Sequence, residues 1–258
     1  MCLLFFAYDC HPHYRLILAA NRDEYYHRPT ERAHFWDSHP LVLAGRDLEM
    51  LGTWMGITRT GRFAALTNFR DPSAQIKDAQ SRGGLVSDFL CYNESPDQYM
   101  LDVVNNRTCY NPFNLLVGDS TSLLYFSNQS SSVKVLGPGI YGLSNNFLDT
   151  PWPKVQKSKQ VLANYLVNRT VVEPQFLFEM LVDTEFAQDN ELPDTGISQE
   201  REKMLSPIFI EGTEYGTRAS TVLLIDRDNH VTFKEKSFIQ GQQQGDEVGY
   251  SFSVSEVR

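Results

Sequence analysis

The chain has 258 residues and a formal net charge of −9, and this acidic balance, with no basic run, argues against nucleic-acid binding. Its 41% hydrophobic and 12% aromatic content allows a sizeable core, so we expect a single domain over residues 1–258. No segment approaches the roughly 18 apolar residues of a membrane-spanning helix, and the chain starts without a signal-peptide pattern. We therefore expect a cytoplasmic protein, or one that enters an organelle by another route.

The cysteines and histidines do not indicate a metal site or a disulfide framework. The four cysteines stand at positions 2, 10, 91 and 109 and never form Cys-x-x-Cys, a spacing that predicts neither zinc binding nor disulfides. His11 and His13 have chelate-like spacing, but no third ligand lies near them in the sequence, and a zinc site needs at least three protein ligands. We expect no metal and no required cofactor.

The first predicted element is a hairpin that brings Cys2 to a polar cluster. Residues 2–8 and 14–20 are short apolar runs, and the Asp and Pro between them favour a turn. An antiparallel fold about this turn pairs positions that sum to roughly 23. Cys2 is then expected opposite Asn21 or Arg22, at the start of Asn-Arg-Asp-Glu.

The next part of the chain has strand and helix patterns in alternation. Residues 25–51 are rich in His, Arg, Asp and Pro, and we expect them to form a long irregular crossing. A second hairpin is predicted over 54–58 and 63–67, and it ends at Asn68. Further helices are expected at 82–92 and 96–104, and further strands at 114–117, 123–126, 133–136 and 140–143.

The last part of the chain is predicted to return from helices to strands. Two helices are expected at 153–167 and 174–181, and the acidic, turn-rich segment 187–200 is expected to be a mobile loop. A third hairpin over 220–226 and 231–236 precedes a polar tail that we expect to be frayed from residue 241. Hairpins at both ends with helices between them predict an α+β domain with largely antiparallel sheets.

Cys2 is the strongest candidate for chemistry. If Met1 is removed, one residue carries both a nucleophilic sulfur and an α-amine, whose reference pKa of about 7.7–8.0 suits a base near neutral pH. A nucleophile paired with its own N-terminal amine is a known arrangement in amide hydrolysis. The competing interpretation is a small apolar residue at the start of a buried strand, since free Cys is usually buried and inert.

The motifs of the chain resemble those of the Asn-Arg-Asp-Glu (NRDE) family, which includes the transport and Golgi organisation protein two homologues. The resemblance covers nearly the whole chain. It rests on Met-Cys at the start, on residues 16–24, and on the segments 27–29, 52–56, 61–68, 141–146, 150–154 and 216–221.

The family's layout is also similar, more remotely, to the N-terminal-nucleophile (Ntn) hydrolases of the penicillin acylase and bile-salt hydrolase kind. This resemblance implies a four-layer αββα fold with two packed, largely antiparallel sheets flanked by helices. It implies catalytic roles for Cys2 as nucleophile, Asp23 as the group that holds the amine, and Asn68 and Asn145 as oxyanion donors. The residues expected to bind substrate are Asn21, Arg22, Glu24, Asn146 and Arg218.

One departure from the bile-salt hydrolases concerns Arg22 and Asp23, which are adjacent here. Adjacent strand residues point to opposite faces, so both can line the site only where the strand ends or bulges. The sequence therefore leaves three functions open, of which the third is a scaffold in membrane traffic. The first is an amidase that cleaves a linear amide bond. The second is a non-catalytic carrier of a small or lipid-like ligand, for which the resemblance implies haem or acyl lipids and an association with Golgi or mitochondria.

Overall fold

The computed structural model describes residues 2–255, and the chain separates into two compact units. Within the described residues, the first unit contains 2–27 and 137–252, and the second contains 28–136 and 253–255. Each unit is built on one seven-stranded antiparallel sheet. The single domain expected from the sequence stays a prediction.

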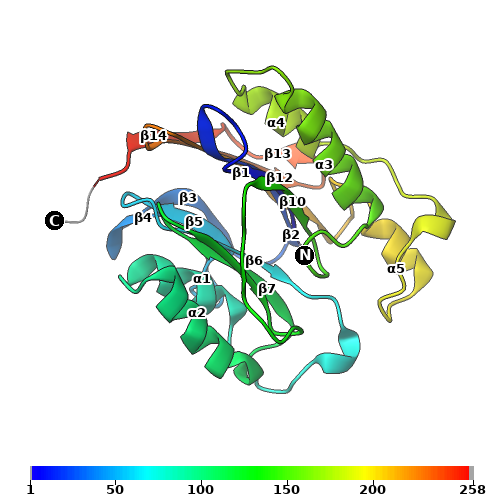
Figure 1. Cartoon of the computed structure of the whole chain (residues 1–258). Coiled ribbons are helices and arrows are strands. Elements are labelled where there is room, and N and C mark those ends of the chain that lie inside the picture. Colours follow the sequence, from blue (N-terminus) through cyan, green and yellow to red (C-terminus); the bar gives the residue numbers. More distant parts are fainter. Residues whose placement is uncertain (1, 256–258) are drawn as a thin grey trace. The chain divides into compact units, whose positions relative to one another are not determined.

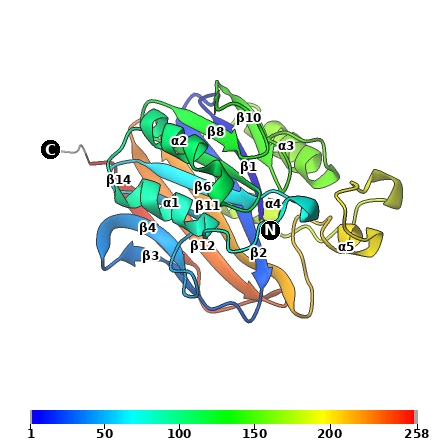
Figure 2. The same ribbon diagram turned by 90° about the horizontal axis from the view of Figure 1, so that it is seen from below.

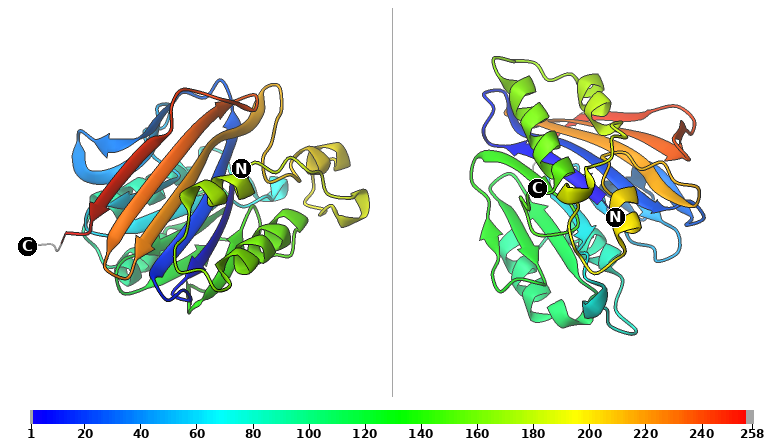
Figure 3. Two further views of the ribbon diagram at one scale, coloured as in Figure 1. Left: turned by 90° about the horizontal axis from the view of Figure 1, so that it is seen from above. Right: turned by 90° about the vertical axis from the view of Figure 1, so that its right-hand side faces the viewer.

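The first unit is centred on the sheet that contains the N-terminal hairpin. The strand order is β10-β1-β2-β11-β12-β13, and β14 also pairs with β12; these strands lie side by side in Figure 3. Their bounds are β1 Cys2–Tyr8, β2 Tyr14–Tyr25, β10 Gly139–Leu143, β11 Tyr215–Asp226, β12 His230–Ile239, β13 Gln242–Gln243 and β14 Val248–Ser253.

Two helices, α3 (Pro153–Leu166) and α4 (Pro174–Leu181), cover one face of this sheet (Figure 1). Each begins with proline at its first position, where the missing N–H costs no helical hydrogen bond. Their apolar sides pack on alternate residues of β1, β2 and β11, among them Phe5, Ile17 and Val222. The side chains of odd-numbered residues in β1 and β2 therefore point toward the helices. A third helix, α5, spans Gln199–Met204.

The second unit repeats this plan with a sheet in sequential order, β3-β4-β5-β6-β7-β8-β9. Helices α1 (Arg82–Cys91) and α2 (Pro96–Asn105) pack on this sheet (Figure 2) and bury a core that includes Phe89, Phe113 and Phe126. The strand bounds are β3 Thr30–Trp36, β4 His39–Asp47, β5 Met55–Thr58, β6 Phe63–Asn68, β7 Phe113–Gly118, β8 Leu123–Ser127 and β9 Lys134–Val135.

The helices and most strands lie close to their predicted positions, and two expectations about coil were wrong. Residues 25–51 contain β3 and β4, which pair as a tight hairpin with Trp36 opposite His39. The segment after residue 241 contains β13 and β14, both paired with β12. Strands β13 and β14 are polar and mostly exposed or half-buried, so hydrogen bonding to β12, and not an apolar pattern, stabilises them. In β3 and β4, by contrast, Trp36, Val42 and Ala44 are buried in the core of the second unit.

The α+β class with antiparallel sheets is confirmed. Over residues 2–255, no helix has both the length and the hydropathy that a membrane crossing requires.

Candidate active site

Pairing of β1 with β2 places Cys2 directly opposite Arg22. This is one of the two facing residues that the hairpin predicted. Directly opposed residues share one face of a sheet, so Cys2 and Arg22 lie on the face away from α3 and α4. Cys2 is buried, with 7% of its surface exposed.

On its other side, β1 pairs with β10, and the end of β10 brings Asn145 toward Cys2. Leu4 pairs with Leu143, and continuing this register by two residues sets Asn145 beside Cys2. The Ser144 hydroxyl donates to the Cys2 carbonyl at 3.2 Å, and Ser144 and Asn145 are both buried. Three neighbouring chain segments therefore bring Asn145, Cys2 and Arg22 to one end of the sheet.

The Asn-Arg-Asp-Glu cluster divides between the two faces of β2. The strand runs to Tyr25 without ending at the cluster, so Asn21 and Asp23 point toward the helices while Arg22 and Glu24 point away. Asn21 and Asp23 are 0% and 1% exposed. As expected for adjacent residues of a continuous strand, the side chains of Arg22 and Asp23 lie on opposite faces of β2.

Asn21 connects the sheet by hydrogen bonds to the segments that cover it. Its amide group donates to the carbonyls of Leu181 and Ile208, both at 2.8 Å, and its side-chain oxygen accepts from the Ser220 hydroxyl at 2.6 Å. Leu181 is the last residue of α4, whose terminal carbonyls have no partner inside the helix. The hydrogen bonds of Asn21 therefore assign it a structural part in the site, and its predicted substrate contact stays a prediction.

Asp23 is a buried carboxylate held by a hydroxyl. Thr217 donates to its Oδ1 at 2.8 Å and accepts from the Ile210 amide at 3.0 Å. Burial raises the pKa of the Asp23 carboxyl, while the charges of Lys154 and Arg22 and the Thr217 hydrogen bond lower it. The protonation state of Asp23 is thus decided by a balance between burial and neighbouring positive charge.

Lys154 supplies that positive charge from the first turn of α3. It is buried, and its ammonium donates to the Leu205 carbonyl at 2.8 Å. The sequence-based site did not include Lys154, although it ends the Thr-Pro-Trp-Pro-Lys segment among the family-like motifs.

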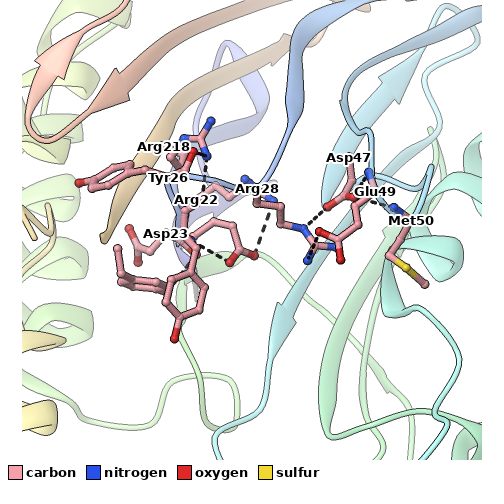
Figure 4. A network of polar contacts seen from close by, with 11 residues as sticks. Arg22, Asp23, Tyr26, Arg28, Asp47, Glu49, Met50 and Arg218 are labelled. Atoms are coloured by element: carbon pink, nitrogen blue, oxygen red, sulfur yellow. Dashed lines mark hydrogen bonds and ion pairs between the residues drawn. The ribbon is translucent and has the colours of Figure 1, made fainter. Parts of the chain in front are cut away.

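Arg22 and Arg218 form the cationic part of the opposite face (Figure 4). Arg22 lies 3.7 Å from the Glu24 carboxylate. The pairing of β2 with β11 skips Arg218, because Thr217 pairs with Asp23 and Ala219 pairs with Arg22. This β-bulge redirects the side chain of Arg218, which donates to the carbonyls of Tyr25 and Tyr26 at 2.9 and 3.1 Å.

The two guanidinium groups are close enough to influence each other. Burial and the positive charge of Arg22 lower the pKa of Arg218, while Glu24 raises it. A pair of half-buried guanidinium groups with one nearby carboxylate is suited to binding an anionic group.

The Cys2 thiol is protonated in the folded chain. Burial raises its pKa to about 11, Asp23 adds to the increase, and the Arg22 charge and the Asp23 backbone N–H oppose it. Only on the order of one thiol in ten thousand is then ionised at pH 7. Reaction at this sulfur requires a base that removes the proton as the bond forms.

Two predicted residues lie elsewhere or are used locally. Asn68 ends β6 in the second unit, where it pairs in register with Phe113, and its oxyanion role stays a prediction. The Asn146 side-chain oxygen accepts from the Phe147 amide at 2.7 Å and from Thr150 at 3.2 Å. It stabilises the turn after β10, as asparagine often does.

The site depends on hydroxyl groups that sequence reasoning missed. Ser144, Thr217 and Ser220 bond directly to Cys2, Asp23 and Asn21. All three belong to the predicted family-like motifs, so those motifs contained the signal, but no local pattern assigned partners to them. Among residues 2–255, no three His, Cys, Asp or Glu side chains gather as metal ligands.

Comparison of the sequence with known families identifies its relatives. The family described as "Transport and Golgi organisation 2" matches residues 1–240. The chain is 38% identical to the transport and Golgi organization 2 homolog of Mus musculus, over 93% of this chain and 94% of that protein. Identity to the Homo sapiens homolog is 36% with the same coverage.

Comparison of the structure with solved structures identifies the fold. Penicillin V acylase from Agrobacterium tumefaciens superimposes with a TM-score of 0.51 at 12% identity, covering 91% of this chain and 82% of that chain. The C2A mutant of conjugated bile acid hydrolase from Clostridium perfringens also gives 0.51, at 9% identity, with 100% and 99% covered. Both are similar in fold only, and they confirm the predicted Ntn-hydrolase-like fold.

Proposed function

The chain belongs to the Transport and Golgi organisation 2 family, and we propose that it is an amide hydrolase in which Cys2 is the nucleophile. The observation that carries the proposal is the pairing of Cys2 with Arg22 on one side, together with the Ser144 hydrogen bond to the Cys2 carbonyl on the other side, next to Asn145. A nucleophile, a cation and an amide donor meet at one strand end, as acyl transfer requires.

The proposed reaction starts with removal of Met1, which frees the α-amine of Cys2. The sulfur then attacks the carbonyl carbon of the substrate amide, and the amine accepts the thiol proton. The C–N bond breaks as this proton passes to the departing amine, and a thioester remains on Cys2. Water hydrolyses the thioester and regenerates the thiol.

The thiol pKa of about 11 fits this sequence of steps. A protonated sulfur in the resting state is protected from unspecific alkylation and oxidation, which follow the thiolate fraction. The adjacent amine can remove the proton when the substrate carbonyl is in place.

The other polar groups take the following parts in the proposal. Asp23 holds the amine in its reactive orientation, and the Asn145 amide carries N–H donors for the oxyanion, each typically worth about 2.7–4 kcal/mol. Arg22 and Arg218 bind an anionic group of the substrate. Met1 lies outside the described residues, so the test starts there.

The test is intact mass spectrometry of the full chain before and after p-nitrophenyl decanoate. We expect a mass lower by one methionine, a hydroxylamine-sensitive decanoyl adduct on the N-terminal peptide, and turnover of at least one acyl p-nitroanilide from a panel of chain lengths. Cys2→Ala should abolish adduct and turnover. Cys10→Ser is the matched control, since Cys10 is exposed, and it should retain both. Retained Met1, or equal labelling of Cys2→Ala, would contradict the proposal.

The second candidate is the non-catalytic carrier, and the burial of Cys2 favours it, since a buried free cysteine usually behaves as a small apolar residue. If Met1 stays in place, the amine is part of a peptide bond and no base of this kind exists. A carrier predicts saturable binding of haem or of an acyl-CoA, measured by Soret absorbance or calorimetry, that Cys2→Ala leaves unchanged. A linear, non-saturating titration with both ligands would remove this alternative.

A further inference from the structure

A groove lies between helices α3 and α4, which cover the sheet of the first unit (Figure 1). Its volume is about 260 Å³. This is slightly below the range of pockets that hold drug-sized ligands, so the groove suits one short chain. Both helices contribute to its lining, and Ile208 joins them from the segment after α5.

Contacts between the two helices define the ends of the groove. At one end the ring of Tyr165 stacks on that of Phe176, with centroids 3.9 Å apart, and Arg169 lies over the Tyr165 ring. At the other end the Lys157 ammonium pairs with the Asp183 carboxylate at 2.5 Å. The helices therefore run antiparallel, and α3 rises about 12 Å between Lys157 and Tyr165.

The wall between these ends is apolar. It consists of Val161 on α3, Phe176 and Met180 on α4, and Ile208. Val161 is 37% exposed, so part of this apolar surface is in contact with water. An aliphatic chain that covers the wall removes apolar area from water, which favours binding.

The end with Lys157 has an excess of negative charge. The Lys157 ammonium lies 2.5 Å from both the Asp183 and the Glu185 carboxylates, so one cation already serves two anions. Glu179 lines the same groove, and its carboxylate accepts from the neutral Gln175 amide at 3.3 Å. Among the described residues that line the groove, Lys157 alone is positively charged. This balance favours a cationic ligand and disfavours the carboxylate of a fatty acid.

We propose that the groove is a binding site for a primary alkylammonium with a chain of medium length, such as octylammonium. The ammonium group binds among Glu179, Asp183 and Glu185, where charge-assisted hydrogen bonds to carboxylates are strong. The chain lies along Val161 and Met180. The groove is on the helix side of the sheet, whereas the Cys2 side chain is on the opposite face, so the site does not depend on the proposed hydrolase activity.

The first experiment is a calorimetric titration of the full chain with octylammonium chloride, below the concentration at which it aggregates. We expect saturable binding of one ligand, and at least tenfold weaker binding of octanoate. Between butylammonium and octylammonium the affinity should rise about two- to fourfold for each added CH₂. Absence of saturable octylammonium binding, or equal affinity for octanoate, would overturn the proposal.

Two pairs of variants test where the ligand binds. Val161→Trp fills the groove and should weaken octylammonium binding more than tenfold. Val167→Trp is its matched control, since Val167 follows the same helix, is 65% exposed and lies outside the lining. Glu179→Gln should weaken binding about fivefold, whereas Asp228→Asn, in the exposed turn before β12, should leave it unchanged. Equal affinities within either pair would overturn the assigned site.

A measurement on the wild type covers the case in which Val161→Trp folds poorly. The methyl ¹³C resonance of Met180, assigned with Met180→Leu, should shift during the octylammonium titration with the same midpoint as the heat. An unchanged Met180 resonance at saturation would overturn the site.

The sign of the ligand charge is tested with Lys157→Met. This substitution leaves Asp183 and Glu185 without their cation, so octylammonium should bind about threefold or more tightly and octanoate more weakly. Weaker octylammonium binding in Lys157→Met would overturn recognition of the ammonium group by these carboxylates.

Discussion

The two units bury polar side chains of different kinds. In the second unit, Asn114 donates to Thr67 at 2.9 Å and accepts from the Tyr125 hydroxyl at 2.8 Å, a network without charge. Arg62 is charged, but it donates to the backbone carbonyls of Phe89, in the last turn of α1, and of Glu94, beyond the end of that helix. These contacts satisfy hydrogen-bonding groups and stabilise the packing of helix on sheet.

The first unit buries groups that can change charge, and three of them lie around one strand end. Asp23 and Lys154 lie behind the end of β2, and the Cys2 thiol lies beside it. Perturbed titratable groups around a nucleophile are typical of functional sites. Burial of polar groups is thus common to both units, and the titratable groups beside Cys2 are what distinguish the proposed site in the first unit.

The largest expected effect is the loss of unfolding free energy when the buried hydrogen bonds of Asn21 in the first unit are removed. Asn21→Leu leaves the carbonyls of Leu181 and Ile208 and the Ser220 hydroxyl without their partner. Each buried group left unsatisfied costs about 1–3 kcal/mol, so we expect a loss of about 3–5 kcal/mol in urea unfolding. Asn146→Ala, in a turn, should cost about 1 kcal/mol or less. Similar losses for the two variants would show that Asn21 is not the connecting residue.

The next effect is a pH dependence that belongs to the first unit. Burial raises the Cys2 pKa from 9.0 to about 11, so the folded state holds this proton more tightly than the unfolded state. The associated stability is complete below pH 9 and is lost as the pH rises toward 11, by about 2–3 kcal/mol. The difference in unfolding free energy between wild type and Cys2→Ala should shrink over this window. A constant difference would show that the thiol is not perturbed.

A similar loss of stability without any effect on the thiol is expected in the second unit. Asn114→Leu removes the partner of Thr67 and Tyr125 and should cost about 2 kcal/mol. Because this network carries no charge, the pH midpoint for iodoacetamide alkylation of Cys2 should stay at its wild-type value. A shifted alkylation midpoint would show that buried polar groups of the second unit also influence the Cys2 thiol.

The sequence predicted the parts of this site that lie close together along the chain. The apolar runs of the first hairpin are short, and a register slip would turn their buried residues outward, so the meeting of Cys2 with Arg22 could be read from local pattern. Helices α3 and α4 were likewise evident from their spacing and initial prolines.

What the sequence could not predict depends on contacts between distant segments. Lys154 reads locally as an ordinary surface residue of a helix, and only packing of α3 on the sheet buries it. The bulge at Arg218 follows from how β11 pairs with β2, which periodicity does not reveal. The polar strands β13 and β14 are stabilised by pairing with β12, so their composition suggested coil. In β3 and β4, the few buried apolar residues stand among His, Arg, Asp and Pro, which concealed the strands.

The smallest expected effect concerns the exposed side of the Cys2 site. Arg22 and Glu24 are 3.7 Å apart and partly exposed, and such pairs contribute about 0–1 kcal/mol, so Glu24→Gln should leave unfolding within about 0.5 kcal/mol of wild type. The Arg22 charge lowers the Cys2 pKa, and removing the opposing carboxylate strengthens that influence. The alkylation midpoint of Cys2 should therefore move to lower pH in Glu24→Gln and to higher pH in Arg22→Met. An unchanged midpoint in both variants would mean that burial alone sets the pKa of the Cys2 thiol, and the charged face of β2 would then have no part in tuning it.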